Sequence, residues 1–345
     1  MAKREEPTNF RALTAELKSG GPQRLYLLWG PEDYLREQFT DALRAACVPE
    51  GADDFSCRRL NGPELDVQAL REAVDSLPFM TERTFVEVRG ADINKVKEQA
   101  AEDAVSVLSD IPDYCTVVFV QDAAYEPDGR LKFVKGIKKY GREIKFTAQA
   151  QDDLVKWVRK RFAAQGKSID PAAAQRLIMV SGALMNRLIP EIDKVAAYAA
   201  GETVTAADID SVAHHIPEAR IFDMTDCIAA KNADGAARIL AELLGDRDNA
   251  PIMLLAAIGR QMRQTYAARL SLDEGLGRKY VEDLTGIKFP FILDRLMKSA
   301  RGFTLPQLSR AVELCCDADY AMKSTGGDAA GILKDAVMRI ASGEC

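Results

Sequence analysis

Strand-like and helix-like patterns alternate over the first 150 residues, and this alternation constrains the fold more than any other feature of the sequence. The run LYLLW (Leu25–Trp29) is continuously apolar, which is typical of a strand buried on both faces of a sheet. Beyond Gly30, apolar residues recur at helical spacing, at Leu35, Phe39, Leu43 and Ala46. A strand, a turn and a helix in this order predict the first unit of a parallel α/β sheet.

The same alternation continues to about residue 150. Further strands are predicted at 84–88, 115–120 and 143–146, and helical segments at 67–77, 94–108 and 131–140. The 67–77 helix should end before Pro78, because proline lacks the N–H that would continue the helical hydrogen bonds. Its apolar stripe is formed by Val67, Leu70, Val74 and Leu77.

The second half of the chain has a different pattern. From Gln151 onward the apolar residues keep helical spacing, and no strand is predicted. Asp170-Pro171 has the form of a helix start, and Thr205–Asp208 has the spacing of a capping box. A loop at Pro217-Glu218 is expected to separate two helical parts. The predicted fold class is therefore α/β plus all-α.

Charge and composition exclude several classes of protein. The net charge of -6 and the pI near 5.3 argue against a chain whose whole surface binds nucleic acid, although a local basic face remains compatible with them. No apolar run approaches the ~20 residues of a membrane span, and MAKREEPTNF lacks the apolar region of a secretory signal. A cytoplasmic location and no membrane partner are therefore expected.

The cysteines do not form a recognisable framework. Seven are scattered along the chain without a CxxC pair, which favours buried thiols over disulfides or a zinc site. They are Cys47, Cys57, Cys115, Cys227, Cys315, Cys316 and Cys345.

The turn after the first strand has the position of a phosphate-binding loop but not its chemistry. A working loop reads GxxxxGK[ST], since backbone N–H groups surround the phosphates, the lysine reaches them and the hydroxyl holds magnesium. Here the turn reads WGPEDYL: Pro31 removes an N–H donor, and Glu32 and Asp33 add negative charge. Tight binding of a triphosphate is not expected.

Other catalytic patterns are weak. Asp122 follows a predicted strand, as a metal-holding aspartate of an ATPase does, but Ala123 and Ala124 follow it, and a turn residue is the simpler interpretation. His214 and His215 are adjacent in a helical region, where successive side chains point in different directions. No GxSxG or HExxH motif is present. No catalytic residue, cofactor or metal site is predicted.

Two surface features carry binding hypotheses. Leu77, Phe79 and Met80 surround Pro78 at a predicted helix end, where together they would form a small apolar patch for a partner. Ordinary core packing is the alternative, above all for Leu77, which could complete the helical stripe. The basic 131–140 helix, with Lys135, Lys138 and Lys139, could neutralise nucleic-acid phosphates, or it could simply present lysines to water.

Several segments, taken in order, resemble the delta subunit of the bacterial DNA polymerase III clamp loader. The resemblance covers nearly the whole chain, and it depends on the order and spacing of motifs that are each weak alone. The segments are YLLWGPEDYL (26–35) with Glu37, SLPFMTER (76–83) before TFVEV, DLVKW (153–157), EIDK (191–194) and DYAMK (319–323).

This resemblance implies an architecture and a function. The architecture would be an AAA+-like domain without a working P-loop at 1–150, a small helical lid at 151–216 and a helical collar at 217–345. The chain would be a non-catalytic subunit of the DNA polymerase III holoenzyme that binds the sliding clamp and favours its open state in chromosome replication. Its partners would be the clamp (beta), the other loader subunits (gamma/tau and delta prime) and primer-template DNA.

The resemblance also assigns residues. It makes Phe79 and Met80 clamp-facing, leaves the role of Leu77 open, and suggests that Tyr320 stacks on a base near the primer junction, with packing in the collar as the alternative.

Two other functions are possible alternatives, and the sequence disfavours both. A divergent AAA+ NTPase is disfavoured by Pro31, Glu32 and the absent lysine. Another clamp-loader subunit is disfavoured because the chain lacks a cysteine-rich zinc insert and a Ser-Arg-Cys segment.

Overall fold

The computed structural model describes residues 9–49, 51–52, 56–79, 81–324 and 327–343. The chain divides into two compact units. The first comprises residues 1–149 and 184–186, and the second comprises 150–183 and 187–345.

The first unit is built on a five-stranded sheet, all of whose pairs are parallel. The strand order is β2-β3-β4-β1-β5, so the first strand lies in the interior of the sheet. The strands are β1 (Leu25–Trp29), β2 (Cys57–Asn61), β3 (Thr84–Arg89), β4 (Cys115–Val120) and β5 (Arg142–Lys145). The expected parallel α/β domain is confirmed. Strand β2 was not predicted, because its sequence CRRLN is too polar to resemble a buried strand.

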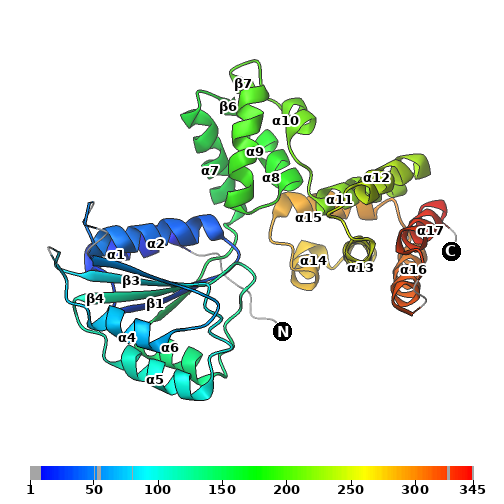
Figure 1. The fold of residues 1–345 in the computed structure, drawn as a ribbon. Coiled ribbons are helices and arrows are strands. Elements are labelled where there is room, and N and C mark those ends of the chain that lie inside the picture. The colour runs from blue at the N-terminus through cyan, green and yellow to red at the C-terminus, as the bar shows by residue number, and fades with distance from the viewer. Residues whose placement is uncertain (1–8, 50, 53–55, 80, 325–326, 344–345) are drawn as a thin grey trace. The chain divides into compact units, whose positions relative to one another are not determined.

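Helices cover both faces of this sheet (Figure 1). Helix α2 (Asp33–Cys47) lies on one face, and α1 (Phe10–Gly20) packs on α2. The opposite face is covered by α4 (Val67–Asp75), α5 (Glu98–Ser109) and α6 (Lys132–Tyr140). An apolar core fills the space under these three helices, and it includes Phe119 and Phe133, whose rings meet edge to face.

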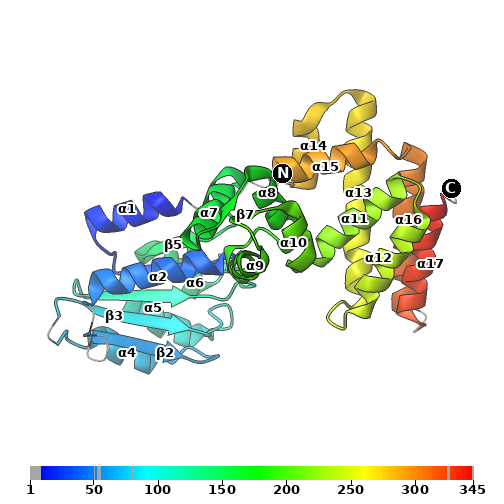
Figure 2. The ribbon, with the colours of Figure 1, turned by 90° about the horizontal axis from the view of Figure 1, so that it is seen from above.

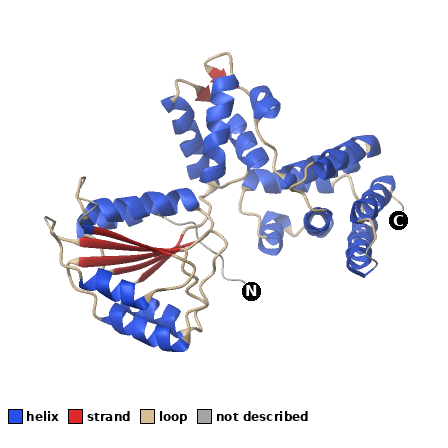
Figure 3. Ribbon diagram, in the orientation of Figure 1, coloured by secondary structure: helices blue, strands red, loops and turns tan. Residues whose placement is uncertain are grey.

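The second unit is almost entirely helical (Figure 3). Two short strands, β6 (Ser168–Ile169) and β7 (Thr203–Val204), pair with each other, so the expectation of no strand after Gln151 is wrong at these residues. Strands of two residues leave too short a pattern to recognise. The helices are α7 (Gln151–Ala164), α8 (Pro171–Ser181), α9 (Met185–Tyr198), α10 (Ala206–Val212), α11 (Pro217–Ala229), α12 (Ala233–Gly245), α13 (Pro251–Glu274), α14 (Gly277–Thr285), α15 (Pro290–Ala300), α16 (Leu305–Ser324) and α17 (Ala329–Ser342).

Local helix signals in this unit are largely confirmed. Asp170 caps α8 by accepting from the N–H of Ala173, and Thr205 and Asp208 form the predicted capping box of α10. The expected loop at Pro217-Glu218 is wrong, because both residues belong to the first turn of α11. Proline is favoured at that position, since the first N–H groups of a helix have no partner within it.

The last helices form a bundle around a shared apolar core. Helices α13, α16 and α17 run alongside one another, and α11 and α12 pack against them (Figure 2). Leu255, Met262, Leu308 and Leu333 are among the fully buried residues of this core. In the described part of the chain, no helix combines the length and the apolar character that crossing a membrane would require.

Candidate functional site

The turn between β1 and α2 is closed by its own backbone and side chains. Gly30 has a φ of +113°, and a Cβ at this position would collide with the carbonyl oxygen of Phe146. Only glycine both adopts this positive φ readily and has no Cβ to collide with Phe146. The N–H of Glu32 donates to the carbonyl oxygen of Phe146 at 3.1 Å, so one donor of the turn is already used.

The side chain of Glu32 is fully buried and interacts with the start of a helix. Both carboxylate oxygens accept from the N–H of Met185, the first residue of α9, at 3.2 and 3.3 Å. Burial raises the pKa of Glu32 to about 7, and the hydrogen bond from Met185 only partly opposes this shift. An internal carboxylate therefore takes the place that a bound phosphate would need at this turn.

The neighbouring charges are also used within the protein. The buried guanidinium of Arg36 donates to the carbonyl oxygen of Gly30 at 2.6 Å and pairs with Asp33. Asp33 in turn accepts from the side-chain amide of Asn186 at 3.1 Å. Arg36 is thus held by protein oxygens, and two acidic side chains lie in the turn.

The apolar segment after α4 is on the surface. Helix α4 ends at Asp75, and the side chain of Leu77 is 74% exposed, so the prediction that Leu77 continues the apolar stripe is wrong. The helix stops two residues early because Ser76 is already extended, with a ψ of 122°. Phe79 is 60% exposed. We call Leu77–Phe79 the tip; Met80, the third predicted residue, lies outside the described residues.

A buried serine holds the backbone of the tip. The Ser56 hydroxyl lies 3.2 Å from the carbonyl oxygen of Phe79 and 2.6 Å from the Thr81 hydroxyl. Thr81 Oγ1 lies 2.9 Å from the carbonyl oxygen of Arg83, which directly precedes β3. Ser56 is 1% exposed. Nothing in the sequence around Ser56 indicates this role, because it depends on a contact between segments 23 residues apart.

The candidate DNA-binding residues are exposed but lie in different units. Helix α6 buries Phe133, Val134, Gly136 and Ile137, so Lys135, Lys138 and Lys139 face water. Lys138 pairs with Glu143 at 2.9 Å, and the Lys139 ammonium lies 4.7 Å from the centre of the Tyr140 ring. Tyr320 on α16 is 74% exposed, so it is not packed into the core of its bundle.

The other candidate residues have structural surroundings. The carbonyl of Asp122 accepts from the N–H of Tyr125 at 3.0 Å, which is a turn contact after β4. Burial lowers the pKa of His215. The described part of the chain contains no group of three His, Cys, Asp or Glu side chains suited to hold a metal ion.

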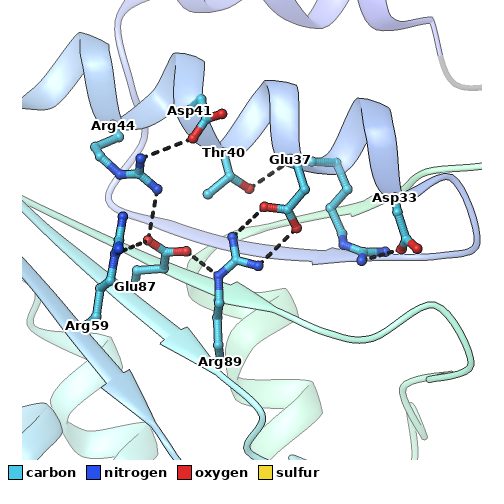
Figure 4. A network of polar contacts seen from close by, with 9 residues as sticks. Asp33, Glu37, Thr40, Asp41, Arg44, Arg59, Glu87 and Arg89 are labelled. Atoms are coloured by element: carbon cyan, nitrogen blue, oxygen red, sulfur yellow. Dashed lines mark hydrogen bonds and ion pairs between the residues drawn. The ribbon is translucent and has the colours of Figure 1, made fainter. Parts of the chain in front are cut away.

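A charged network joins α2 to the sheet (Figure 4). Glu87 on β3 is 1% exposed and pairs with Arg44, Arg59 and Arg89. Arg89 also donates to both carboxylate oxygens of Glu37, at 2.9 and 2.7 Å. Burial alone would raise the pKa of Glu87, but the arginines outweigh it and the pKa is lowered. No motif in the sequence indicates this network, since its members come from three elements, α2, β2 and β3.

The fold and this turn define a class of protein: an α/β domain on a parallel five-stranded sheet, whose turn after β1 holds a buried internal carboxylate, followed by a mostly helical region. Sequence models narrow the class. The model described as DNA polymerase III, delta subunit, matches residues 26–147, and the model for the C-terminal domain of that subunit matches residues 218–340. Together they cover well over half of the chain, which therefore belongs to the DNA polymerase III delta subunit family.

Individual relatives agree with this assignment. The chain is 27% identical over 317 residues to the DNA polymerase III subunit delta of Bacillus subtilis, covering 89% of this chain and 90% of that protein. It is 20% identical over 284 residues to the probable DNA polymerase III subunit delta of Aquifex aeolicus, covering 78% and 77%. The solved Bacillus subtilis DNA clamp loader delta protein shares the fold, with a TM-score of 0.55 and 22% identity over 96% of this chain and 99% of that one.

Proposed function

We propose that this chain is a clamp-loader subunit that binds the sliding clamp through the tip and favours the open form of the clamp. The observation that supports this most directly is the exposure of Leu77 and Phe79 beside Pro78. Burying two such side chains in a partner contributes roughly 3 to 6 kcal/mol, before the cost of association. The apolar tip is therefore sufficient as an anchor but needs further contacts for tight binding.

The clamp would be opened by differential affinity. A ligand shifts an equilibrium between two states only as far as it binds one of them better than the other. In this proposal, binding of ATP by other members of the loader makes the tip accessible, and the tip then binds the open clamp more tightly than the closed one. This chain supplies binding free energy and no bond chemistry.

A non-catalytic role is supported by the filled turn. The buried carboxylate of Glu32 and the missing N–H of Pro31 oppose a triphosphate beside Gly30. The alternative, a divergent AAA+ NTPase, requires that nucleotide bind to the isolated chain. Titration with ATP and magnesium distinguishes the two: the proposal expects no saturable binding.

The remaining partners are also proposals. We propose the division into an AAA+-like domain (1–150), a lid (151–216) and a collar (217–345), in which the collar joins the other loader subunits (gamma/tau and delta prime). Primer-template DNA would contact Lys135, Lys138, Lys139 and Tyr320, all exposed. Lysines would contact phosphates without reading the sequence, as a loader of any primer junction requires.

The test is a binding measurement with the sliding clamp of the same organism. Phe79→Ala, Leu77→Ala and the double variant should weaken clamp binding by at least about tenfold, while unfolding curves stay close to the wild type. A matched control is Leu284→Ala, since Leu284 on α14 is 59% exposed and lies in the other unit. Wild-type affinity in the Phe79→Ala and double variants would remove the tip from the clamp interface.

A further inference from the structure

The tip lies near the edge of the sheet that is formed by the amino ends of the strands. Because all five strands are parallel, their amino ends lie at the same edge. The tip leads into β3 through Arg83, and Arg24 precedes β1 at this same edge. The carboxyl ends of α5 and α6 also lie here, since both helices run antiparallel to the strands they precede or follow.

This edge contains a hollow. Its volume is 460 Å³, enough to admit more than one side chain of a partner. The side walls come from the ends of α5 and α6, with Leu108, Ile111 and the 40%-exposed ring of Tyr140. The remaining wall comes from the segment before β1 and from Arg83. The tip and the hollow are therefore close in sequence, because Arg83, which lines the hollow, follows soon after Phe79.

The charge of the hollow is positive. Among the described residues that line it are two arginines and no aspartate or glutamate. Arg83 donates to the carbonyl oxygens of Pro22 and Asp113, at 3.4 and 2.6 Å, and both of these acceptors are neutral. Arg24 donates to the carbonyl oxygen of Ile111 at 3.1 Å and pairs with the side chain of Asp113, which is 86% exposed. Such a solvent-exposed pair is weak, so Asp113 is readily exchanged for another carboxylate.

We propose that this hollow is a second contact for the partner that binds the tip, and that it receives an aspartate or glutamate side chain from a surface loop of that partner. The inference rests on the proposed function of the tip. Arg83 is fixed by two carbonyl oxygens, so a carboxylate would meet a preformed donor, and Arg24 would exchange Asp113 for it. Contacts at two points fix the orientation of the partner, and complementary charge speeds association.

The experiment measures the affinity of the full chain for the sliding clamp at low and at high salt. Arg24→Glu should weaken binding about tenfold at low salt, and the loss should shrink at high salt, because exposed charges are screened. Arg24→Gln, which keeps a donor toward Ile111, should show a smaller loss. Phe79→Ala should weaken binding equally at both salt concentrations, because its contribution is apolar.

Arg130→Glu is the matched control. Arg130 is also an exposed arginine paired with an aspartate, Asp128, but it lies in the segment after β4, at the carboxyl edge of the sheet. The Arg130→Glu variant should bind the clamp as the wild type does. The unfolding curves of Arg130→Glu and Arg24→Glu should be similar. If Phe79→Ala loses binding while Arg24→Glu and Arg24→Gln match Arg130→Glu, the second contact is refuted and the tip stands. If Phe79→Ala binds normally, the proposed function itself fails.

Discussion

Both carboxylate oxygens of Glu32 lie within 3.3 Å of the backbone nitrogen of Met185. In a working phosphate-binding loop the anion comes from a nucleotide and the positive charge from a lysine. Here the anion is part of the chain, and the N–H of Met185 at the start of α9 donates to it. The absence of the lysine is thus matched by a structural replacement, which fixes the start of α9 to the β1–α2 turn.

Replacing Glu32 by glutamine should stabilise the protein above neutral pH. The pKa of Glu32 is about 7 in the folded protein against 4.5 for an ordinary glutamate, so the folded state binds more protons between these values. Stability from this group therefore falls as pH rises from about 4.5 to 7, and the ionised carboxylate opposes folding above that. The free energy of unfolding of Glu32→Gln should exceed that of the wild type by at most ~3 kcal/mol at pH 8.

Urea unfolding of wild type and Glu32→Gln between pH 5 and 8 measures this effect. The two curves should converge at pH 5, where the wild-type carboxyl is protonated in the folded state. A gain that does not depend on pH would mean that burial of the charge is not its cause. Glu64→Gln serves as a control, since Glu64 is an exposed glutamate of the same unit.

The sequence predicted those features that depend on local patterns. Runs rich in apolar and β-branched residues identified β1, β3 and β4, and cap residues identified the starts of α8 and α10. Strand β2 escaped because an edge strand with exposed arginines has no apolar pattern. The exposure of Leu77 escaped because helical periodicity says which face a residue would occupy, but not where the helix stops.

Contacts between segments that are far apart in the sequence could not be predicted from local patterns. Glu32 was recognised as an acidic residue in a phosphate-binding position, but its bond to Met185 joins residues 153 positions apart. Likewise, Ser56 and the arginines around Glu87 carry no motif. The sequence therefore showed that the lysine of a nucleotide site is missing. It did not show that the carboxylate of Glu32 bonds to Met185 instead.

Replacing Ser56 by alanine should loosen the tip without unfolding the domain. The change removes the hydroxyl between the Phe79 carbonyl and Thr81, a loss of ~1–2 kcal/mol at a buried site. Amide exchange at residues 81–83 should accelerate, and clamp affinity should fall several-fold. Ser211→Ala, which removes an exposed hydroxyl on α10, in the other unit, is the control. Unchanged exchange in Ser56→Ala would show that the tip is held by other contacts.

The basic helix and Tyr320 should differ in their response to salt. If Lys135 and Lys139 contact DNA phosphates, replacing both by alanine lowers the slope of log affinity against log salt by roughly one per lysine. Lys138→Ala should change it less, because Lys138 already pairs with Glu143. Tyr320→Ala should lower junction affinity while keeping the slope, since stacking releases no counterions. Titrations of the assembled loader with primer-template DNA measure both, and equal slopes for all variants would assign α6 to solvent.

Replacing Glu87 by glutamine should destabilise the first unit, most strongly at neutral pH. Three arginines surround this buried carboxylate, and removing its charge weakens the compensation of all three, although Arg44 keeps its pair with Asp41 and Arg89 keeps its pair with Glu37 (Figure 4). The expected loss is ~2–3 kcal/mol, less than for a fully buried pair because the arginines are partly exposed.

The pH dependence of Glu87 should be opposite to that of Glu32. Its pKa is lowered in the folded protein, so its stabilisation is present above the ordinary glutamate pKa and disappears as pH falls through the lower folded value. Wild type should therefore lose its advantage over Glu87→Gln in acid. Glu102→Gln, at an exposed pair with Lys132, is the control and should cost no more than ~0.5 kcal/mol. Since the arginines are provided by α2, β2 and β3, a loss no larger than this control would mean that the apolar contacts of α2 alone fix that helix on the sheet.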